Sequence, residues 1–278
     1  MDAKLRCFDV ISAGEVHLQL GSASRDGQRV FSLRRGAVGA ALSLASAGLR
    51  VGLVTTLDDD SLGRALLARV AARGVDVDGV SLGVPSRGIV FVQASGHASD
   101  VVSYRDEERP FNVPPAWSSA VLLLSGLTPV VSVAGSLCKA ARAARRAGSV
   151  VVVSVGARSH VWQGRDPRAI RMLLREADVI RYTAHDLSCL GMEAADVRKE
   201  ARDGAVHVFS NAMGETVTNG PFGEVATERG RGRAPATSAH DGDPVTTALC
   251  VALARARGAE AQQGEMWRRL AAESHATR

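Results

Sequence analysis

The residues with the clearest chemical potential are His240-Asp241-Gly242-Asp243, which run directly into an apolar, alanine-rich segment that begins at Pro244. A turn-forming run that ends in aspartate at a helix start brings free backbone N–H groups and a carboxylate to one point. The N–H groups could hold the charge of a transferred phosphoryl group, while Asp243 accepts a proton from an attacking hydroxyl. The pattern therefore indicates either phosphoryl transfer or simply a capped helix after a turn.

The elements that must position this motif alternate between short apolar strands and helices. Strands are expected at residues 8–13, 51–56, 120–124, 149–155, 177–182 and 206–210, and helices at 36–48, 60–74, 136–147, 166–176, 194–203 and 244–254. Because the strands are continuous apolar runs separated by helices, we expect a largely parallel sheet covered on both faces. Such sheets bind ligands at the carboxyl ends of their strands, which is where the Asp243 motif is then expected to lie.

One region departs from this alternation. Residues 88–94 and 101–105 have the composition of two β-strands, and the small and polar residues 95–98 between them predict a hairpin turn. A hairpin beside an α/β body is expected to act as a lid over the ligand.

Composition argues against several function classes. The 278 residues are 46% hydrophobic but contain no apolar run of about 18 residues, and the chain starts without a secretion signal, so we expect a cytoplasmic protein. The net charge of +5 suggests nucleic acid, yet the 31 arginines are spread along the chain beside acidic residues. The densest basic clusters, 142–146 and 229–233, lack interleaved aromatics. We therefore expect neither a membrane nor a nucleic-acid partner.

Taken in order, these segments resemble the ribokinase-like (PfkB) family of carbohydrate kinases across nearly the whole chain, and within it the 2-keto-3-deoxygluconate kinases. Residues 36–63 resemble the first family signature, in which a glycine-rich helix start is followed by a strand and a G-D-D-x-x-G-like turn. The second signature, D-T-x-G-A-G-D, falls on residues 237–243, where the final Gly242-Asp243 is present.

The resemblance implies an α/β fold, namely a ribokinase-like three-layer α/β/α sandwich with a mainly parallel central sheet and a small β-lid. It implies one kinase domain over residues 1–278, with lid segments at approximately 15–35 and 86–110. Lid strands in this family often pair between subunits, which is compatible with a homodimer formed through the lid.

The resemblance also implies the reaction, which is transfer of phosphate from ATP, with Mg²⁺, to a hydroxyl of a small-molecule sugar or sugar acid. On this pattern Asp243 is the general base, because an alcohol attacks poorly until its proton is accepted. The backbone N–H groups of Asp241, Gly242 and Asp243 would form the anion hole. The metal-binding motif N-x-x-E falls on residues 183–186, so Asp186 is expected to hold Mg²⁺ through water.

Two further matches favour an acidic substrate such as 2-keto-3-deoxygluconate. Residues 103–105 resemble the Y-x-R of the acidic-sugar branch, and residues 158–162 resemble its R-x-x-L-W. Two guanidinium groups that face one pocket would suit a carboxylate, which the planar fork binds bidentately. From the residues alone, an exposed lid arginine and a loop arginine packed on Trp162 are equally good interpretations. The expected substrate contacts are Gly36, Tyr104, Arg105 and Arg158.

Several positions depart from the family pattern where chemistry is expected, namely Gln19, Arg35, Ala40, Ser154, Gly156, His240 and Asp241. A second carboxylate beside the anion hole repels phosphates, and histidine tolerates a tight turn poorly where the family has glycine. Only 35 residues follow Asp243, so the adenine pocket is expected to be partly absent or rebuilt. Two alternatives therefore stay open: a catalytically impaired protein that binds a metabolite or partner, and a nucleoside kinase of the same fold.

Overall fold

A large central sheet organises the computed structural model, which describes residues 5–21, 30–32, 36–83, 88–95, 98–104, 112–162, 164–211, 215–221, 223–227 and 243–256. Within these residues the strand order is β14 (Gly223–Thr227), β13 (Thr216–Gly220), β12 (Val206–Ser210), β11 (Val179–Thr183), β10 (Val150–Ser154), β9 (Trp117–Leu124), β1 (Arg6–Ala13), β4 (Val51–Asp58) and β5 (Val75–Asp76). A further strand, β6 (Val80–Gly83), pairs with β4. Pairing is parallel from β12 to β5, while β13 and β14 extend the sheet in antiparallel pairing. The mainly parallel sheet expected from the sequence is confirmed.

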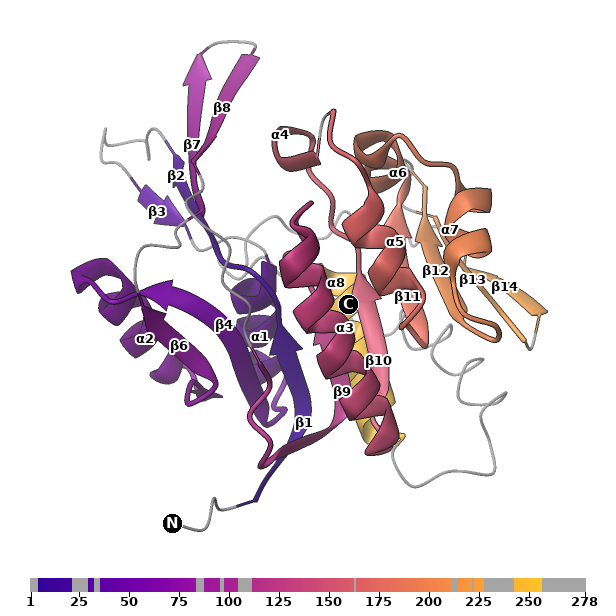
Figure 1. The fold of residues 1–278 in the computed structure, drawn as a ribbon, viewed down its shortest axis with the longest axis horizontal. Helices are drawn as coiled ribbons and strands as arrows, with labels where there is room; N and C mark the ends of the chain where they lie inside the picture. The colour runs from indigo at the N-terminus through magenta and orange to yellow at the C-terminus, as the bar shows by residue number, and fades with distance from the viewer. Residues whose placement is uncertain are drawn as a thin grey trace.

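Helices cover both faces of this sheet. One face carries α3 (Val131–Arg146), α5 (Arg168–Leu174) and α7 (Ala194–Glu200), and the other carries α1 (Gly36–Ser46) and α8 (Pro244–Arg255) (Figure 1). Side chains alternate along each strand, so Leu122 and Leu124 of β9 pack against the first layer while Val121 and Leu123 pack against the second. The remaining helices are α2 (Ser61–Ala71), α4 (Ser159–Trp162) and α6 (Ala184–Leu190). The three-layer α/β/α architecture is therefore confirmed.

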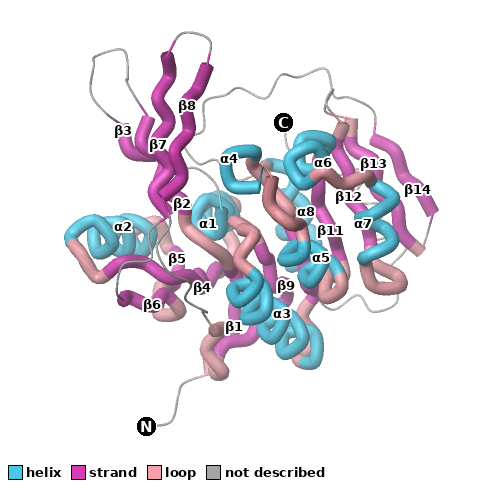
Figure 2. Tube along the Cα trace, turned by 45° about the horizontal axis from the view of Figure 1, so that its top comes forward, coloured by secondary structure: helices cyan, strands magenta, loops and turns pink. Residues whose placement is uncertain are grey.

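A separate four-stranded sheet projects from the body beside β4 and α1 (Figure 2). Its order is β3 (Val30–Ser32), β2 (His17–Gly21), β7 (Gly88–Ser95) and β8 (Ala98–Tyr104). The β7–β8 pair is antiparallel, so the hairpin expected between residues 88 and 105 is confirmed, and β2 joins β7 in parallel pairing. These four strands lie within the two segments for which the sequence predicts a lid.

The largest difference from the expected helices lies at the start of α3. This helix begins at Val131, whereas the sequence predicts a start at Ser136. Gly135 lies inside the first turns without ending them, because Val133, Ala134 and Leu137 are buried against the core. Burial of this apolar stripe outweighs the low helix propensity of one glycine.

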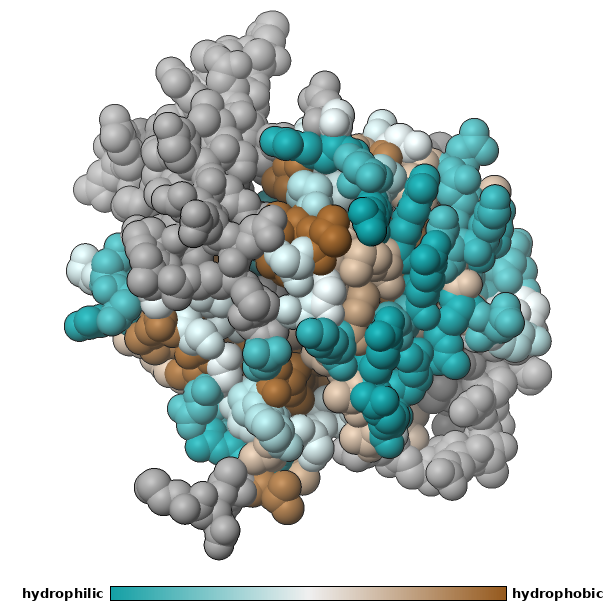
Figure 3. All heavy atoms as spheres, in the orientation of Figure 1, coloured by the Kyte–Doolittle hydropathy of each residue, from teal (hydrophilic) through white to brown (hydrophobic). Residues whose placement is uncertain are grey.

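Paired charges cover the outer surface of the α3, α5 and α7 layer. Figure 3 shows hydrophilic side chains gathered over these helices, and several of them are arginines in ion pairs with Glu176, Glu200 and Asp178. Each helix thus has one apolar and one charged face. None of the described helices combines the length and the apolar composition of a membrane span.

Glu176 anchors this charged layer from a buried position. Its side chain is 9% exposed and accepts hydrogen bonds from Nε of Arg142 at 2.6 Å and Nη2 of Arg145 at 2.8 Å. Burial acts to raise the pKa of the Glu176 carboxyl, but the bonds and charges of the two arginines outweigh burial and hold its pKa below the ordinary value. A carboxyl with a lowered pKa contributes stability that is present above its unfolded pKa and is lost as the pH falls through the folded value.

We expect Glu176→Gln to reduce the free energy of unfolding by about 1–2 kcal/mol at neutral pH. The variant should also lose less stability than the wild type when the pH falls from about 5 to 3. Urea denaturation across this range measures both effects, with Asp203→Asn at an exposed site as the control. An unchanged pH dependence in Glu176→Gln would contradict the assignment.

Candidate active site

A pocket of about 450 Å³ lies at the carboxyl ends of β9, β10 and β11, beside the starts of α1 and α8. After β1, the chain adds β4 and β5 on one side of β1 and later adds β9 and β10 on the other side. The strand order therefore reverses between β1 and β9. Open α/β sheets bind ligands at such a switch point. Gly36, Arg158, Asp186 and Asp243, which are distant in sequence and were each expected at the site, all line this pocket.

Close backbone packing forms the wall of the pocket around Gly36. Gly36 and Gly126 have φ angles of +76° and +66°, in the left-handed region that favours glycine. A Cβ atom would lie 2.7 Å from the carbonyl oxygen of Glu15 at position 36, and 2.4 Å from the same oxygen at position 126. Glycine is therefore required here for the ends of β1 and β9 to meet the start of α1.

Asp243 is the N-cap residue of α8 and also faces the pocket. Its Oδ1 accepts a hydrogen bond from the backbone N–H of Val245 at 3.2 Å, and its Oδ2 accepts one from Oγ1 of Thr246 at 2.7 Å. Pro244 occupies the first helical position, where its missing N–H has no intrahelical partner to lose. The side chain is 36% exposed, so the carboxylate that caps the helix is also accessible from the pocket.

Asp186 is held at the start of α6 by a reciprocal capping arrangement. Its Oδ2 accepts hydrogen bonds from the backbone N–H of Thr183 at 2.7 Å and from Oγ1 of Thr183 at 2.9 Å, and Oγ1 accepts from the Asp186 N–H at 3.0 Å. Burial raises the pKa of the Asp186 carboxyl, against the opposing effects of Thr183 and of the Arg181 charge. A buried carboxylate with a raised pKa gains stability from a nearby cation.

The donor set around Asp186 fits a metal held through water. Among the described residues, no three histidine, cysteine, aspartate or glutamate side chains gather into one cluster. Mg²⁺ keeps several waters and is usually bound by one or two carboxylates together with substrate phosphates. Asp186 supplies one such carboxylate in the pocket lining, and a bound cation would offset the cost of burying its charge.

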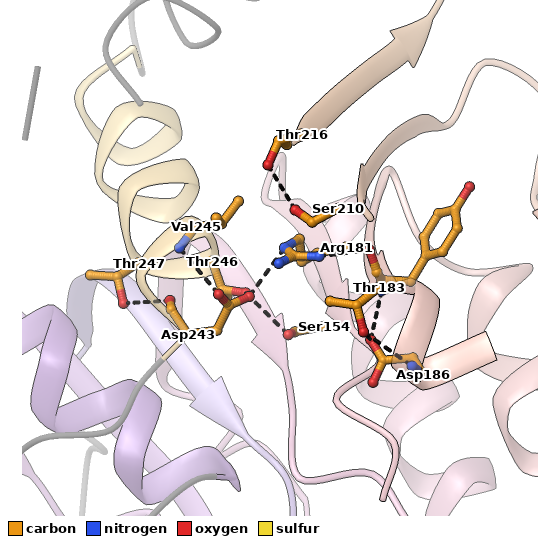
Figure 4. Close-up of polar contacts among 11 residues, drawn as sticks. Ser154, Arg181, Thr183, Asp186, Ser210, Thr216, Asp243, Val245, Thr246 and Thr247 are labelled. Atoms are coloured by element: carbon orange, nitrogen blue, oxygen red, sulfur yellow. Dashed lines mark hydrogen bonds and ion pairs between the residues drawn. The ribbon is translucent and has the colours of Figure 1, made fainter. Parts of the chain in front are cut away.

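Arg181 is a site residue that sequence reasoning missed. It lies within β11 with its side chain 5% exposed, and its Nε is 3.1 Å from Oδ2 of Asp243 (Figure 4). Its Nη1 donates a hydrogen bond to the carbonyl oxygen of Tyr182 at 2.6 Å. One buried guanidinium therefore acts on both expected functional carboxylates, Asp186 and Asp243. The available signal was a lone charge inside an otherwise apolar strand, which requires a partner.

The expected substrate contacts are placed in part. Arg158 is half-buried in the pocket wall just before α4, and β8, which ends at Tyr104, lies next to α4. Arg105, Asp241 and Gly242 lie outside the described residues. Contacts between these residues and a substrate stay a prediction.

Three of the departures from the family pattern line the same pocket. Ala40 and Gly156 stand where the pattern has asparagine, and Ser154 stands where it has aspartate. Each replacement is smaller than the residue of the pattern and offers fewer groups for hydrogen bonds. The backbone at Gln19 is part of β2, whereas Arg35, His240 and Asp241 lie outside the described residues.

Comparison with known proteins agrees with this architecture. Residues 9–220 match the model of the pfkB family carbohydrate kinases, and the chain belongs to this family. It is 27% identical over 180 residues, 59% of this chain and 55% of the relative, to a 5-dehydro-2-deoxygluconokinase of Shouchella clausii. A 5-dehydro-2-deoxygluconokinase of Bacillus velezensis is 23% identical over 202 residues, 66% of this chain and 61% of the relative. The chain thus spans less than two thirds of the length of these curated relatives.

Solved structures share the fold at low sequence identity. A fructokinase from Xylella fastidiosa with bound ATP has a TM-score of 0.74 at 17% identity, over 97% of this chain and 92% of that chain. An aminoimidazole riboside kinase from Salmonella enterica has a TM-score of 0.74 at 17% identity, over 96% and 90% of the two chains. At this identity the likeness shows the fold alone.

Proposed function

We propose that this protein is an ATP-dependent kinase of a sugar acid, and that its substrate is a deoxygluconate of the 2-keto-3-deoxygluconate or 5-dehydro-2-deoxygluconate kind. The observation that carries the proposal is one pocket, at the switch point of a pfkB-family fold, lined by Asp243, Asp186, Arg158 and Gly36. In this pocket Asp243 supplies a base and Asp186 a carboxylate for a cation. Arg158 supplies a cation for a carboxylate, and Gly36 lets the backbone form a close wall.

In this proposal each charged residue has one task. Asp243 accepts the proton of the acceptor hydroxyl, and the backbone N–H groups of Asp241, Gly242 and Asp243 bind the transferred phosphoryl group. Asp186 holds Mg²⁺ through water, and the bound ion neutralises charge on the phosphates. The small sheet acts as a lid that excludes water from the pocket, and a homodimer paired through this sheet belongs to the same proposal.

The acidic substrate is supported by charge and by the shape of the pocket. Arg158 in the pocket wall can bind a carboxylate bidentately, with Tyr104 and Arg105 of the hairpin segment as further contacts. Ala40, Ser154 and Gly156 reduce the number of groups that could hold sugar hydroxyls. A deoxygenated sugar acid has one hydroxyl fewer to satisfy, so both features favour the substrate class that the names of the curated relatives indicate.

The test is a transfer assay with Mg-ATP on four acceptors: 5-dehydro-2-deoxygluconate, 2-keto-3-deoxygluconate, fructose and aminoimidazole riboside. We expect kcat/KM for one of the two acids to exceed that for either neutral acceptor at least about 100-fold, because only the acids offer a carboxylate to the Arg158 guanidinium in the pocket wall. Arg158→Ala should remove most of this preference. Product mass and ADP release measure transfer.

Other outcomes of the assay decide between the alternatives. Preferred transfer to the riboside would establish the nucleoside-kinase alternative, and preferred transfer to fructose would contradict an acidic substrate. Binding of ATP or acceptor by titration calorimetry, without transfer to any acceptor, would establish the catalytically impaired alternative.

A further inference from the structure

The two carboxylate oxygens of Asp243 have different surroundings. Oδ2 accepts the hydrogen bond from Thr246 Oγ1 at 2.7 Å and lies 3.1 Å from Nε of Arg181. Among the described residues, Oδ1 accepts a single hydrogen bond, from the backbone N–H of Val245 at 3.2 Å. Each carboxylate oxygen has about two acceptor positions. Oδ2 therefore has one hydrogen bond and one ion-pair contact, in which the Nε–H of Arg181 is not aligned as a hydrogen bond. Oδ1 has one hydrogen bond and keeps one position for a further donor.

The hydroxyl groups of Thr246 and Ser154, which lead to Oδ2, can donate their hydrogen bonds in only one direction. Thr246 Oγ1 has one proton, which it donates to Asp243, so its 3.1 Å contact with Ser154 Oγ requires Ser154 to be the donor. Both side chains are buried, and Figure 4 shows them between α8 and β10. An aspartate at position 154, as in the family pattern, would compete with Asp243 for the single proton of Thr246. Serine instead completes a chain of donors that ends at Oδ2.

Arg181 holds the other side of Oδ2. Its guanidinium cannot be neutralised by losing a proton, so a buried position requires a carboxylate partner. Asp243 is the carboxylate that it contacts at ion-pair distance among the described residues. The bond from Nη1 to the Tyr182 carbonyl fixes the guanidinium to the backbone of β11. The guanidinium in turn fixes the carboxylate of Asp243, the N-cap residue of α8, which lies 62 residues later in the sequence.

We propose that Arg181 and Thr246 are positioning residues that orient the Asp243 carboxylate so that Oδ1 accepts the proton of the substrate hydroxyl; this inference rests on the proposed function. As Oδ1 takes the proton, the hydroxyl oxygen forms a bond to the terminal phosphorus of ATP. The bond from that phosphorus to the bridging oxygen breaks, and its electron pair leaves on ADP. Arg181 and Thr246 act through Asp243 in this step.

Two substitutions remove the contacts to Oδ2 while keeping side-chain bulk. We expect Thr246→Val and Arg181→Met each to lower kcat about 10- to 100-fold, because each contact is made to a charged acceptor. The KM values for ATP and for the acid should change less than about threefold. Thr246→Ser and Arg181→Lys should restore part of the lost kcat, which a purely structural role would not predict. Thr218→Val, at a buried threonine of β13, is the matched control.

A second measurement, of the unfolding equilibrium, tests the ion pair between Arg181 and Asp243 without an activity assay. Asp243→Asn leaves the Arg181 charge buried without its partner, so we expect the equilibrium constant for unfolding to rise at least about 10-fold. Adding Arg181→Met to Asp243→Asn should reverse most of that rise, giving a clear non-additivity in the double-mutant cycle.

The outcomes separate this inference from the proposed function. An active wild type with an unchanged kcat in both Thr246→Val and Arg181→Met would overturn the positioning role. Additive effects in the unfolding cycle would also overturn it, because Arg181 would then not hold Asp243. A wild type that transfers phosphate to no acceptor would overturn the proposed function instead, and the unfolding cycle would still decide whether Arg181 fixes the carboxylate.

Discussion

Asp243→Asn should lower kcat for the sugar acid about 10²- to 10⁴-fold, the usual contribution of a general base. Asparagine keeps an oxygen that can accept the Thr246 hydrogen bond, but it cannot take up the proton of the acceptor hydroxyl. Because this proton moves only during transfer, we expect the affinity for the sugar acid to change little. Single-turnover kinetics with saturating Mg-ATP measures the loss directly.

The control for this prediction is Asp78→Asn, at an exposed carboxylate that pairs with Arg6 far from the pocket in sequence and in the fold. It should leave kcat unchanged. The Asp243→Asn assay is made below the melting transition of the variant, since loss of the Arg181 partner also lowers stability. If Asp243→Asn kept more than about a tenth of the wild-type kcat, Asp243 would not be the base.

Trp162→Ala should reduce the free energy of unfolding by about 3–5 kcal/mol, the range for removing a large aromatic side chain from a core. Trp162 is 1% exposed and packs in the cluster shared with α3 and α5, and its Nε1 donates to the carbonyl oxygen of Leu127 at 3.3 Å. Its backbone N–H donates to the carbonyl oxygen of Arg158 at 2.9 Å, so the same change should raise KM for the acid by loosening Arg158.

Urea denaturation measures this loss, with Trp162→Phe as the comparison. Phenylalanine keeps much of the buried area but loses the bond to Leu127, so a smaller loss of about 1–2 kcal/mol is expected. Equal stability of the wild type and Trp162→Ala would show that this residue is not a core anchor. If Trp162→Ala does not fold, the stability of Trp162→Phe still tests the prediction.

The parts of the fold that could be predicted are those with strong apolar patterns. Strands β9, β10 and β12 are nearly continuous apolar runs, and each was expected within three residues of its observed bounds. By contrast, β13 reads Thr-Val-Thr-Asn-Gly and lies towards the edge of the sheet, where little apolar surface has to be buried. An edge strand is defined by its neighbour more than by its own residues, so the sequence gives little signal for it.

The site follows the same division. Asp243 could be found because it directly precedes a helix after a recognisable turn. Asp186 could be found because residues 183–186, directly after a strand, resemble the metal-binding motif of the family. The contact of Arg181 with Asp243 depends on how β11 and α8 pack against each other in space. A local sequence pattern does not predict this packing. The burial of Arg181 is what distinguishes it from the many exposed arginines of this chain.

The placement of α8 means that the site is completed only after the strands that α8 covers have been synthesised. This helix packs against α1, β1, β9 and β10, in the middle of one face of the sheet, although it is the final described element. Until residues 243–256 leave the ribosome, the growing chain exposes the apolar side chains of β9 and β10 that α8 covers, and Arg181 has no counter-charge from Asp243. Nascent chains arrested before residue 243 should therefore be chaperone clients, and docking of α8 both covers these side chains and completes the site.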